Sequence, residues 1–402
     1  MRLSFFALMA TLFLAGACSD APQTSTPAKR ATTPGPSAGS PTTASGKTRI
    51  ALLLPLSGGN AALGQSLQQA AEMALFDTGA KELALSTYDS GSTPDAAVDA
   101  YRKARTAGSA LVLGPLFGTS ATALAPLVAQ GGPMGGANVV SFSNDEAAAS
   151  RGVFIMGIAA PPQVRRVVDH AIDAGIKRFA TFAPHTPYGE QMARTLESHV
   201  AVRGGTVVAA ELFDANSNDL MIAARRLAGE TQGGSGAKGG GDGKLAVLVP
   251  VAPPRLTSVL SALTAAGLDK ATVQFIGTGV WDVPGIGADT TLRGAWYAAP
   301  DPARRADFER RYVSTYGRPP HRLATLAYDS VALAGHLARL KPGGDFSAEA
   351  ITNPNGWSGV DGIFRFLPDG RSERALAVIE VQGDRNVVIS PAPGTFTSRP
   401  VN

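Results

Sequence analysis

Residues 50–56 read IALLLPL, and residues 62–77 read ALGQSLQQAAEMALFD. The first stretch is a short apolar run of the kind that forms a strand buried on both faces. In the second stretch, apolar residues recur at the spacing of one helix face, at Leu63, Leu67, Ala71, Ala74 and Leu75. A strand followed directly by a helix predicts one βα unit, the building block of parallel sheets.

The alternation of strand and helix continues along the chain in two series. In the first series, the pattern predicts strands at 83–88, 110–113 and 138–142, and helices starting at Pro94 and Ser120. In the second series, which begins near Gly152, it predicts strands at 178–182, 206–212, 245–249 and 273–276, and helices starting near Gln163, Gly189, Asn218 and Pro254. Two such series predict an α/β protein with two lobes, each a parallel sheet flanked by helices.

Composition is that of a globular protein. Of 402 residues, 44% are hydrophobic and 17% are charged, which excludes a disordered chain and a multi-span membrane protein. Lys and Arg number 36 against 32 Asp and Glu. The basic pairs Arg165-Arg166, Arg225-Arg226 and Arg304-Arg305 fall within helical patterns, and we interpret them as solvated helix faces. Nucleic-acid binding would need denser basic clusters, so no nucleic-acid partner is expected.

The N-terminus has the pattern of an export signal. Arg2 precedes an apolar stretch at 3–14, and the small residues 15–17 precede Cys18. The stretch is too short to span a bilayer. We expect a signal peptide at 1–17. It resembles a bacterial lipoprotein signal, in which Cys18 becomes lipidated, although Leu14 lies one position earlier than is usual. An ordinary signal peptide is the alternative. Cys18 is the only cysteine, so no disulfide within the chain is possible.

Three segments have the composition of flexible chain. Residues 18–47 are rich in Thr, Pro and Ser, which predicts a disordered tether of roughly 30 Å as a coil. Residues 229–243, GETQGGSGAKGGGDG, predict a surface loop within the second lobe. This loop is not a phosphate-binding P-loop, because Lys238 stands where a glycine is required and Leu245 where a Ser or Thr is required. Residues 392–402 are expected to form a flexible tail.

The sequence shows no motif for catalysis, a metal or a cofactor. The five histidines have no HExxH spacing, and no G-x-S-x-G sequence lies between a predicted strand and a predicted helix, where a nucleophile elbow would stand. We therefore expect a protein that is not an enzyme and that has no cofactor.

Residues 49–391 resemble type I periplasmic binding proteins of the leucine and amide-binding family. The order of several stretches carries the resemblance, among them IALLLPLSG, LVLGPLFGTSATALAPLVAQ, NVVSFSND, ATFAPHTPYGEQMA, QFIGTGVWD and LATLAYDSVALAGHL. The resemblance implies a two-lobed fold with three interlobe crossovers, near Ala160, near Gly277 and between Leu340 and Trp357. The first lobe would then comprise 48–160 and 278–345, and the second 161–277 and 346–391.

The resemblance also implies a ligand in the cleft between the lobes, where strand ends meet helix starts. On the first lobe, Thr119 and Ser120 begin a helix and offer an anion site, or simple helix capping as the alternative. Ser141, Ser143 and Asn144 follow a buried strand, where the family binds a ligand carboxylate; turn formation is the alternative.

On the second lobe, Tyr188 resembles the family tyrosine that closes over the ligand, with helix packing as the alternative. Trp281 and Asp282 are candidates for the cleft wall, and a structural Trp is equally compatible. Thr278 is a further candidate for ligand binding, and Thr278-Gly279-Val280 stands where amino-acid binders have an acid for the ligand ammonium. The ammonium partner is therefore missing or supplied by Asp282. An aromatic expected after 245–249 is replaced by Pro250-Val251-Ala252-Pro253.

Two functions follow from the resemblance. The first is a lipid-anchored solute-binding protein of an ABC-type amino-acid transport system, with an amino acid, amide or peptide-like ligand and an ABC permease as partner. The second is an activator of a penicillin-binding protein, which shares the fold and stimulates a peptidoglycan synthase by contact. Ser19, and not an aspartate, follows Cys18, and the aspartate stands one residue later at Asp20; this permits sorting to the outer membrane, so we expect a periplasmic, outer-membrane lipoprotein.

Overall fold

The computed structural model describes residues 42–43, 46–131, 136–217, 219–232, 243–271, 273–383 and 385–396. The expected signal peptide, Cys18, most of the tether, Asn218 and most of the glycine-rich loop lie outside these residues. Two ends of the expected flexible segments are ordered: Thr42 forms a β-bridge with Thr48, and the guanidinium of Arg365 lies 4.8 Å from the ring of Phe396.

The first lobe is built on a parallel sheet with the strand order β2-β1-β3-β4-β5. Its strands are β1 (Thr48–Leu54), β2 (Leu83–Asp89), β3 (Leu111–Leu113), β4 (Asn138–Ser141) and β5 (Val153–Ile155). Its helices are α1 (Ala61–Asp77), α2 (Pro94–Thr106), α3 (Gly118–Ala129), α8 (Pro302–Tyr316), α9 (Ala324–Arg339) and α10 (Ala348–Ile351), with short 3-10 turns η1 (Gly58–Asn60) and η3 (Glu146–Ala148).

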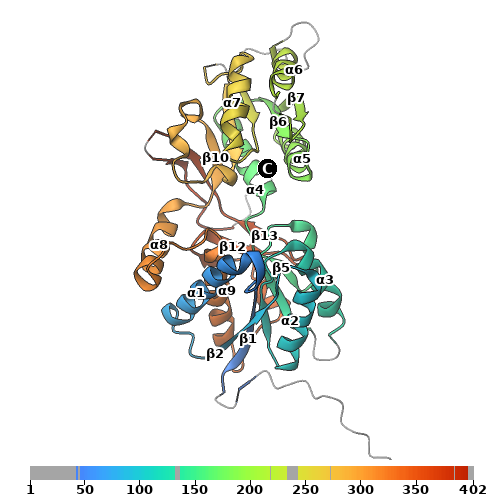
Figure 1. The fold of residues 1–402 in the computed structure, drawn as a ribbon, viewed down its shortest axis with the longest axis vertical. Coiled ribbons are helices and arrows are strands. Elements are labelled where there is room, and N and C mark those ends of the chain that lie inside the picture. The colour runs from blue at the N-terminus through green and yellow to red at the C-terminus, as the bar shows by residue number, and fades with distance from the viewer. Residues whose placement is uncertain are drawn as a thin grey trace, which may run out of the picture. The chain divides into compact units, whose positions relative to one another are not determined.

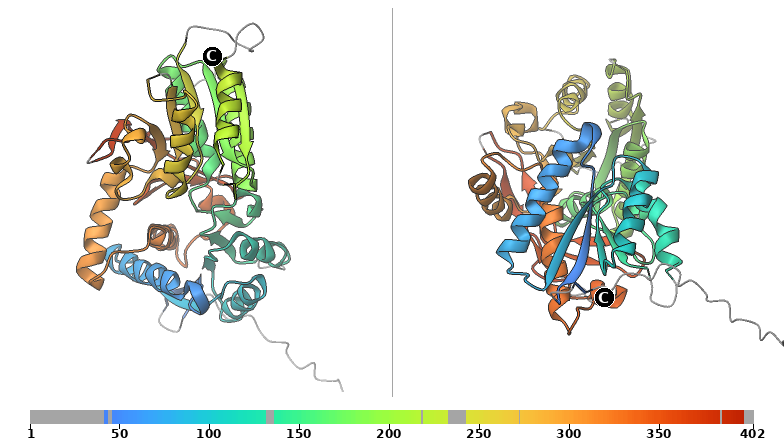
Figure 2. Two further views of the ribbon diagram at one scale, coloured as in Figure 1. Left: turned by 45° about the horizontal axis from the view of Figure 1, so that its top comes forward. Right: turned by 60° about the horizontal axis from the view of Figure 1, so that its bottom comes forward.

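The side chains of β1 explain why both faces of this sheet are covered. Successive residues of a strand point to opposite faces. Leu52 packs in the core that contains α1 and α9, whereas Leu53 packs in the core that contains α2 and α3. Figure 1 shows α1 and α9 side by side, and Figure 2 shows helices on both sides of the first sheet.

The second lobe is built on a mixed sheet with the order β15-β14-β10-β9-β8-β6-β7. The strands are β6 (Arg178–Pro184), β7 (Thr206–Phe213), β8 (Leu245–Leu248), β9 (Val273–Thr278), β10 (Trp296–Ala299), β14 (Ala377–Glu380) and β15 (Val387–Ser390). Its helices are α4 (Ala160–Asp173), α5 (Pro187–Val202), α6 (Met221–Gln232) and α7 (Arg255–Ala265), with 3-10 turns η4 (Gly279–Trp281), η5 (Ile286–Ala288) and η6 (Thr290–Leu292). The last two strands pair antiparallel, so the sheet is parallel only from β7 to β10.

A small antiparallel sheet belongs to the first lobe. It comprises β11 (Trp357–Gly359), β12 (Gly362–Phe366) and β13 (Ser372–Arg374). Trp357, Phe364 and Phe366 are buried in the same core as α1 and α9, and the Phe366 ring lies 5.5 Å from that of Phe154 in β5.

Two of the three crossings between the lobes lie later than we expected. The first falls at 156–159, close to Ala160. The second falls at 300–301 rather than near Gly277, because β10 pairs with β9 and continues the second sheet. The third falls at 375–376 rather than between Leu340 and Trp357, because β11 to β13 pack on the first-lobe core. In sequence alone, these short strands carry no signal of the lobe that they join.

Candidate functional site

The two serine side chains at the end of β4 and just after it form hydrogen bonds to backbone groups. Ser141 is fully buried, and its hydroxyl donates to the carbonyl of Pro115 at 2.8 Å. The Ser143 hydroxyl accepts from the backbone N–H of Asp145 at 3.0 Å. Asn144 is exposed. Of these three predicted residues, Asn144 therefore presents the side chain most open to a ligand.

The start of α3 already has a carboxylate beside it. A Cβ added to Gly118 would lie 2.8 Å from Oδ2 of Asp145, so this carboxylate closely approaches the helix N-terminus. Thr119 is exposed, whereas Ser120 is fully buried and its hydroxyl has no hydrogen-bond partner among the described residues. A helix N-terminus favours an anion. Asp145 supplies that charge from within the chain and would repel a ligand carboxylate placed there.

The second-lobe candidates Tyr188 and Thr278 are brought together. The Tyr188 hydroxyl and the Thr278 hydroxyl are 2.9 Å apart, and Thr278 is fully buried. Burial raises the pKa of Tyr188, while the bond to Thr278 acts in the opposite direction. The tyrosine ring packs beside the core of α4 and α5. Its hydroxyl is thus held toward the carboxyl end of β9.

At Gly279, where amino-acid binders of the family have an acid, the backbone is hydrogen-bonded to the side-chain amide of Gln163. The backbone N–H of Gly279 donates to Oε1 of Gln163 at 2.6 Å, and the Gln163 side chain in turn donates to the carbonyl of Ala159 at 2.9 Å. Gln163 comes from the first turn of α4. A neutral amide cannot replace the carboxylate that would pair with an ammonium group.

Trp281 is part of the core rather than of an exposed wall. It is fully buried, and its indole N–H donates to the carbonyl of Val251 at 3.0 Å. Val251 is 5% exposed and packs in the same core. The segment at 250–253, which has no aromatic residue, is therefore fixed to Trp281.

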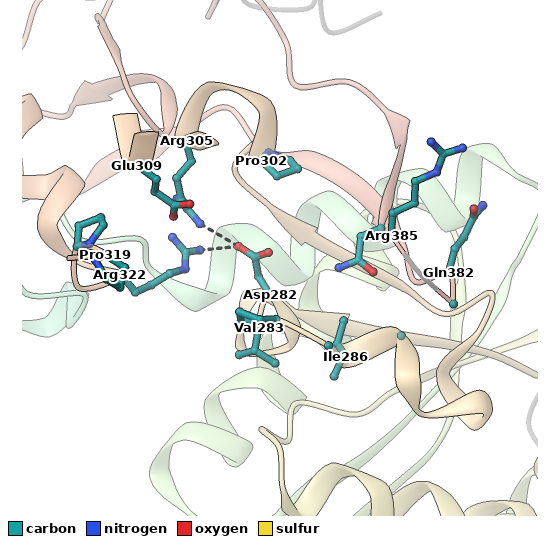
Figure 3. Close-up of a pocket in the computed structure, with 16 residues that line it drawn as sticks. Asp282, Val283, Ile286, Pro302, Arg305, Glu309, Pro319, Arg322, Gln382 and Arg385 are labelled. Carbon is teal, nitrogen blue, oxygen red and sulfur yellow. Dashed lines mark hydrogen bonds and ion pairs between the residues drawn. The ribbon is translucent and has the colours of Figure 1, made fainter. Parts of the chain in front are cut away.

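Asp282 is the predicted residue with the richest surroundings. Its Oδ2 accepts from Arg305 at 3.1 Å and from Arg322 at 2.7 Å, and its Oδ1 accepts from the Tyr297 hydroxyl at 3.4 Å. Figure 3 shows both guanidinium groups converging on this carboxylate. Asp282 follows β9 of the second lobe, whereas Arg305 on α8 belongs to the first. The ion pairs thus bridge the lobes, and Asp282 is already neutralised by cations.

Arg305 also binds a second acid. Its other terminal nitrogen pairs with Asp361, which is fully buried and also accepts from the Thr325 hydroxyl at 2.6 Å. Burial acts to raise the pKa of Asp361, but Arg305, Arg374 and Arg322 together hold it below its usual value. We call Asp282, Arg305, Arg322 and Asp361 the crossover ion cluster, because they lie beside the second crossing.

A pocket of about 550 Å³ opens beside this cluster (Figure 3). The second lobe contributes residues 282–287 together with Gln382, Gly383, Arg385 and Asn386, and the first lobe contributes Pro302, Arg305, Glu309, Pro319, Pro320 and Arg322. We call it the interlobe pocket. Its walls combine arginine side chains with apolar groups such as Val283 and Ile286. Such a surface suits a ligand with a negative charge and an apolar body.

Sequence reasoning missed both arginines. We had interpreted Arg304-Arg305 as a solvated face, yet Arg305 is only 7% exposed. One signal was available: Asp301 and Pro302 mark a helix start, which places Arg305 one turn into α8. Nothing in the local pattern indicated that this turn faces another lobe.

Among the described residues, no helix is long and apolar enough to cross a membrane, and no group of three or more His, Cys, Asp or Glu side chains is arranged to hold a metal ion.

A sequence profile described as "Periplasmic binding protein" matches residues 47–386. The chain belongs to this family. Solved structures share the type I fold at low identity. A candidate branched-chain amino acid ABC transporter from Rhodospirillum rubrum is 20% identical with a TM-score of 0.72, covering 85% of this chain and 100% of that one. A substrate-binding protein from Desulfitobacterium hafniense in complex with Leu is 19% identical with a TM-score of 0.60, covering 85% and 99%.

Other relatives of this periplasmic binding protein differ in what they bind. A solute-binding protein from R. palustris in complex with benzoate is 18% identical with a TM-score of 0.57, covering 86% of this chain and 97% of that one. An uncharacterised protein of Rickettsia prowazekii is 22% identical over 178 residues, which are 44% of this chain and 46% of that protein. The match thus spans about half the length of that relative. Membership of the family implies a periplasmic location.

Proposed function

We propose that this protein is the solute-binding component of an ABC-type transport system, anchored to a membrane by lipid at Cys18. The family assignment and the solved neighbours support solute binding. The short apolar stretch before Cys18 supports the anchor. A Cys18→Ala variant tests this part of the proposal. It should lose acylation, and an acylated, mature-size variant in the membrane fraction would contradict it.

We further propose that the ligand is a small carboxylate with a neutral body, rather than a free α-amino acid. One observation carries this choice: the Asp282 carboxylate is already paired with two arginines, and an amide covers the position at Gly279. An ammonium group in a desolvated cleft without a partner costs several kcal/mol. Benzoate, which a solved neighbour binds, has the proposed chemistry.

Arg322 is the residue that we propose for the ligand charge. Its side chain is 35% exposed, lines the interlobe pocket and uses one terminal nitrogen on Asp282. A guanidinium has five N–H donors, so donors remain for a carboxylate. Thr119, Asn144 and Tyr188 are proposed as neutral contacts from the strand ends.

Native mass spectrometry of the full chain, purified from its own periplasm, tests the proposal. An anionic small molecule should travel with the wild-type protein and be lost from Arg322→Gln. Arg318→Gln is the matched control, because Arg318 is exposed and lies outside the lining of the pocket. Retention of the same molecule by Arg322→Gln would exclude the assigned role.

A second candidate function rests on the crossover ion cluster. Ion pairs from Asp282 to Arg305 and Arg322 join the lobes without a ligand. This favours a protein that acts by contact, such as an outer-membrane activator of a penicillin-binding protein. If no small molecule is recovered and the chain retains a peptidoglycan synthase in a pull-down, this function replaces transport.

A further inference from the structure

A second pocket lies at the other end of the second-lobe sheet. Its volume is about 320 Å³, and it is lined by residues that precede or begin β8, β9 and β10. These three strands are parallel neighbours, so their amino ends meet at one edge. The predicted ligand groups Tyr188 and Thr278 lie instead at carboxyl ends of strands in this sheet. This pocket also shares no lining residue with the interlobe pocket, so it is a distinct site.

Three cations converge on this edge. Lys244 directly precedes β8, Lys270 lies three residues before β9, and Arg293 lies three residues before β10. All three are exposed. Within the part of the chain that the structure describes, none of them forms an ion pair with a carboxylate. No carboxylate in that part of the chain therefore neutralises their positive charge by an ion pair.

Neutral oxygens hold the two lysines in place. The Lys244 ammonium donates to Oε1 of Gln274 at 3.0 Å, and the Lys270 ammonium donates to the carbonyl of Thr290 at 3.4 Å. Gln274 is 5% exposed, and its amide N–H donates to the carbonyl of Gly294 at 2.7 Å. The floor of the pocket is thus a fixed amide, which positions Lys244 without neutralising it.

Arg293 lies at the rim of this pocket, and Glu380, a carboxylate that lines it, already accepts two hydrogen bonds. A Cβ added to Gly383 would lie 3.2 Å from a terminal nitrogen of Arg293, so the guanidinium packs on this glycine. Glu380 lines the pocket, but its two oxygens accept from the Trp296 indole at 3.2 Å and from the Gln382 amide at 3.1 Å. Three cations therefore face a single carboxylate.

We propose that Lys244, Lys270 and Arg293 form a binding site for a phosphate group. A net excess of two positive charges matches a phosphate, which carries about −1.5 to −2 at neutral pH, better than a single carboxylate. Lysines serve phosphate as point charges, and arginine adds directional N–H donors. The phosphate can come from a soluble phosphate or phosphate monoester, or from the phosphodiester of a phospholipid headgroup, which carries only one negative charge; both present anionic phosphate oxygens to the three cations.

Calorimetric titration of the full chain with inorganic phosphate tests the site. The triple variant Lys244→Gln, Lys270→Gln and Arg293→Gln should bind phosphate about tenfold more weakly or worse, because the charged donors are lost. The control variant Lys81→Gln, Lys103→Gln and Arg304→Gln removes the same charge from exposed positions of the first lobe. It should keep wild-type affinity. Added salt should weaken binding to the wild-type chain.

A vesicle assay separates the two sources. In a Cys18→Ala background, each protein is sedimented with phosphatidylcholine vesicles that contain or lack phosphatidylglycerol. Binding that needs phosphatidylglycerol and is lost in the triple variant supports the headgroup. Binding of phosphate alone supports a soluble ligand. Equal binding by the triple and control variants, or no binding of either probe by the wild-type chain, overturns the proposal. Far-UV circular dichroism verifies that both variants are folded.

Discussion

At the strand ends, the candidate ligand groups are neutral and many bond to their own lobe: Ser141 to Pro115, Tyr188 to Thr278, and Gly279 to Gln163. At the second crossing, the polar groups are charged and bond across the lobes, from Asp282 to Arg305 and Arg322. The comparison shows that the charged groups lie beside the second crossing and not at the position of the missing acid. The interlobe pocket, rather than Gly279, is where an ionic ligand would find a partner.

The largest expected effect comes from removing Arg305. An Arg305→Met variant leaves Asp361 buried without its cation and frees one side of Asp282. Breaking a buried pair on one side costs about 3–5 kcal/mol. Urea unfolding should show a loss of this size. Arg304→Met, an exposed neighbour on the same helix, should change stability by less than about 0.5 kcal/mol. Equal losses of stability in the two variants would show that the crossover ion cluster does not stabilise the fold.

A pH-dependent effect should come from Asp329, which lies beside the cluster on α9. Burial raises the pKa of its carboxyl to about 7, while Arg374 acts to lower it and Asp361 to raise it. Its Oδ1 accepts from the backbone N–H of Val360 at 2.8 Å. An unfolded aspartate titrates near 3.9. From about pH 4 to pH 7 the folded state therefore holds a proton that the unfolded state has lost, and the free energy of unfolding falls as pH rises.

An Asp329→Asn variant removes this titration. The free energy of unfolding of this variant, relative to that of wild type, should rise by a few kcal/mol between pH 4 and pH 7. Each pKa unit of difference between the folded and unfolded states corresponds to about 1.4 kcal/mol. Urea unfolding across this range measures the change. Asp99→Asn, which replaces an exposed carboxylate in the same way, is the control. A flat difference between Asp329→Asn and wild type would contradict the assignment.

The smallest effect is expected at the strand ends. Tyr188→Phe removes one neutral hydrogen bond and leaves the buried Thr278 hydroxyl without that partner, at a cost of about 1–2 kcal/mol. Tyr88→Phe is a suitable control, because Tyr88 is also half-buried and the structure describes no hydrogen bond from its hydroxyl. A loss of stability in Tyr188→Phe as large as that in Arg305→Met would contradict the expected difference between the two regions.

The fold was predictable where the signal is local. The run at 50–56 and the helix spacing after it predict β1 and α1, because burial on both faces leaves a continuous apolar stretch. The second and third crossings were not predictable, since β10 and β11 to β13 are short and distant partners in the chain decide which lobe each strand joins. In the site, Tyr188 was chosen from its resemblance to the family tyrosine, and the role of Tyr188 and Thr278 in ligand binding stays a prediction. Arg305 was not, because its partners Asp282 and Asp361 lie 23 and 56 residues away.

The central claim is that the cleft of this protein recognises a carboxylate and lacks a partner for an α-ammonium group. Parallel calorimetric titrations of the full chain with benzoate and with leucine test it most directly. We expect benzoate to bind and leucine to bind at least about 100-fold more weakly, since an unpaired ammonium costs several kcal/mol. Tight binding of leucine with no heat from benzoate would contradict it.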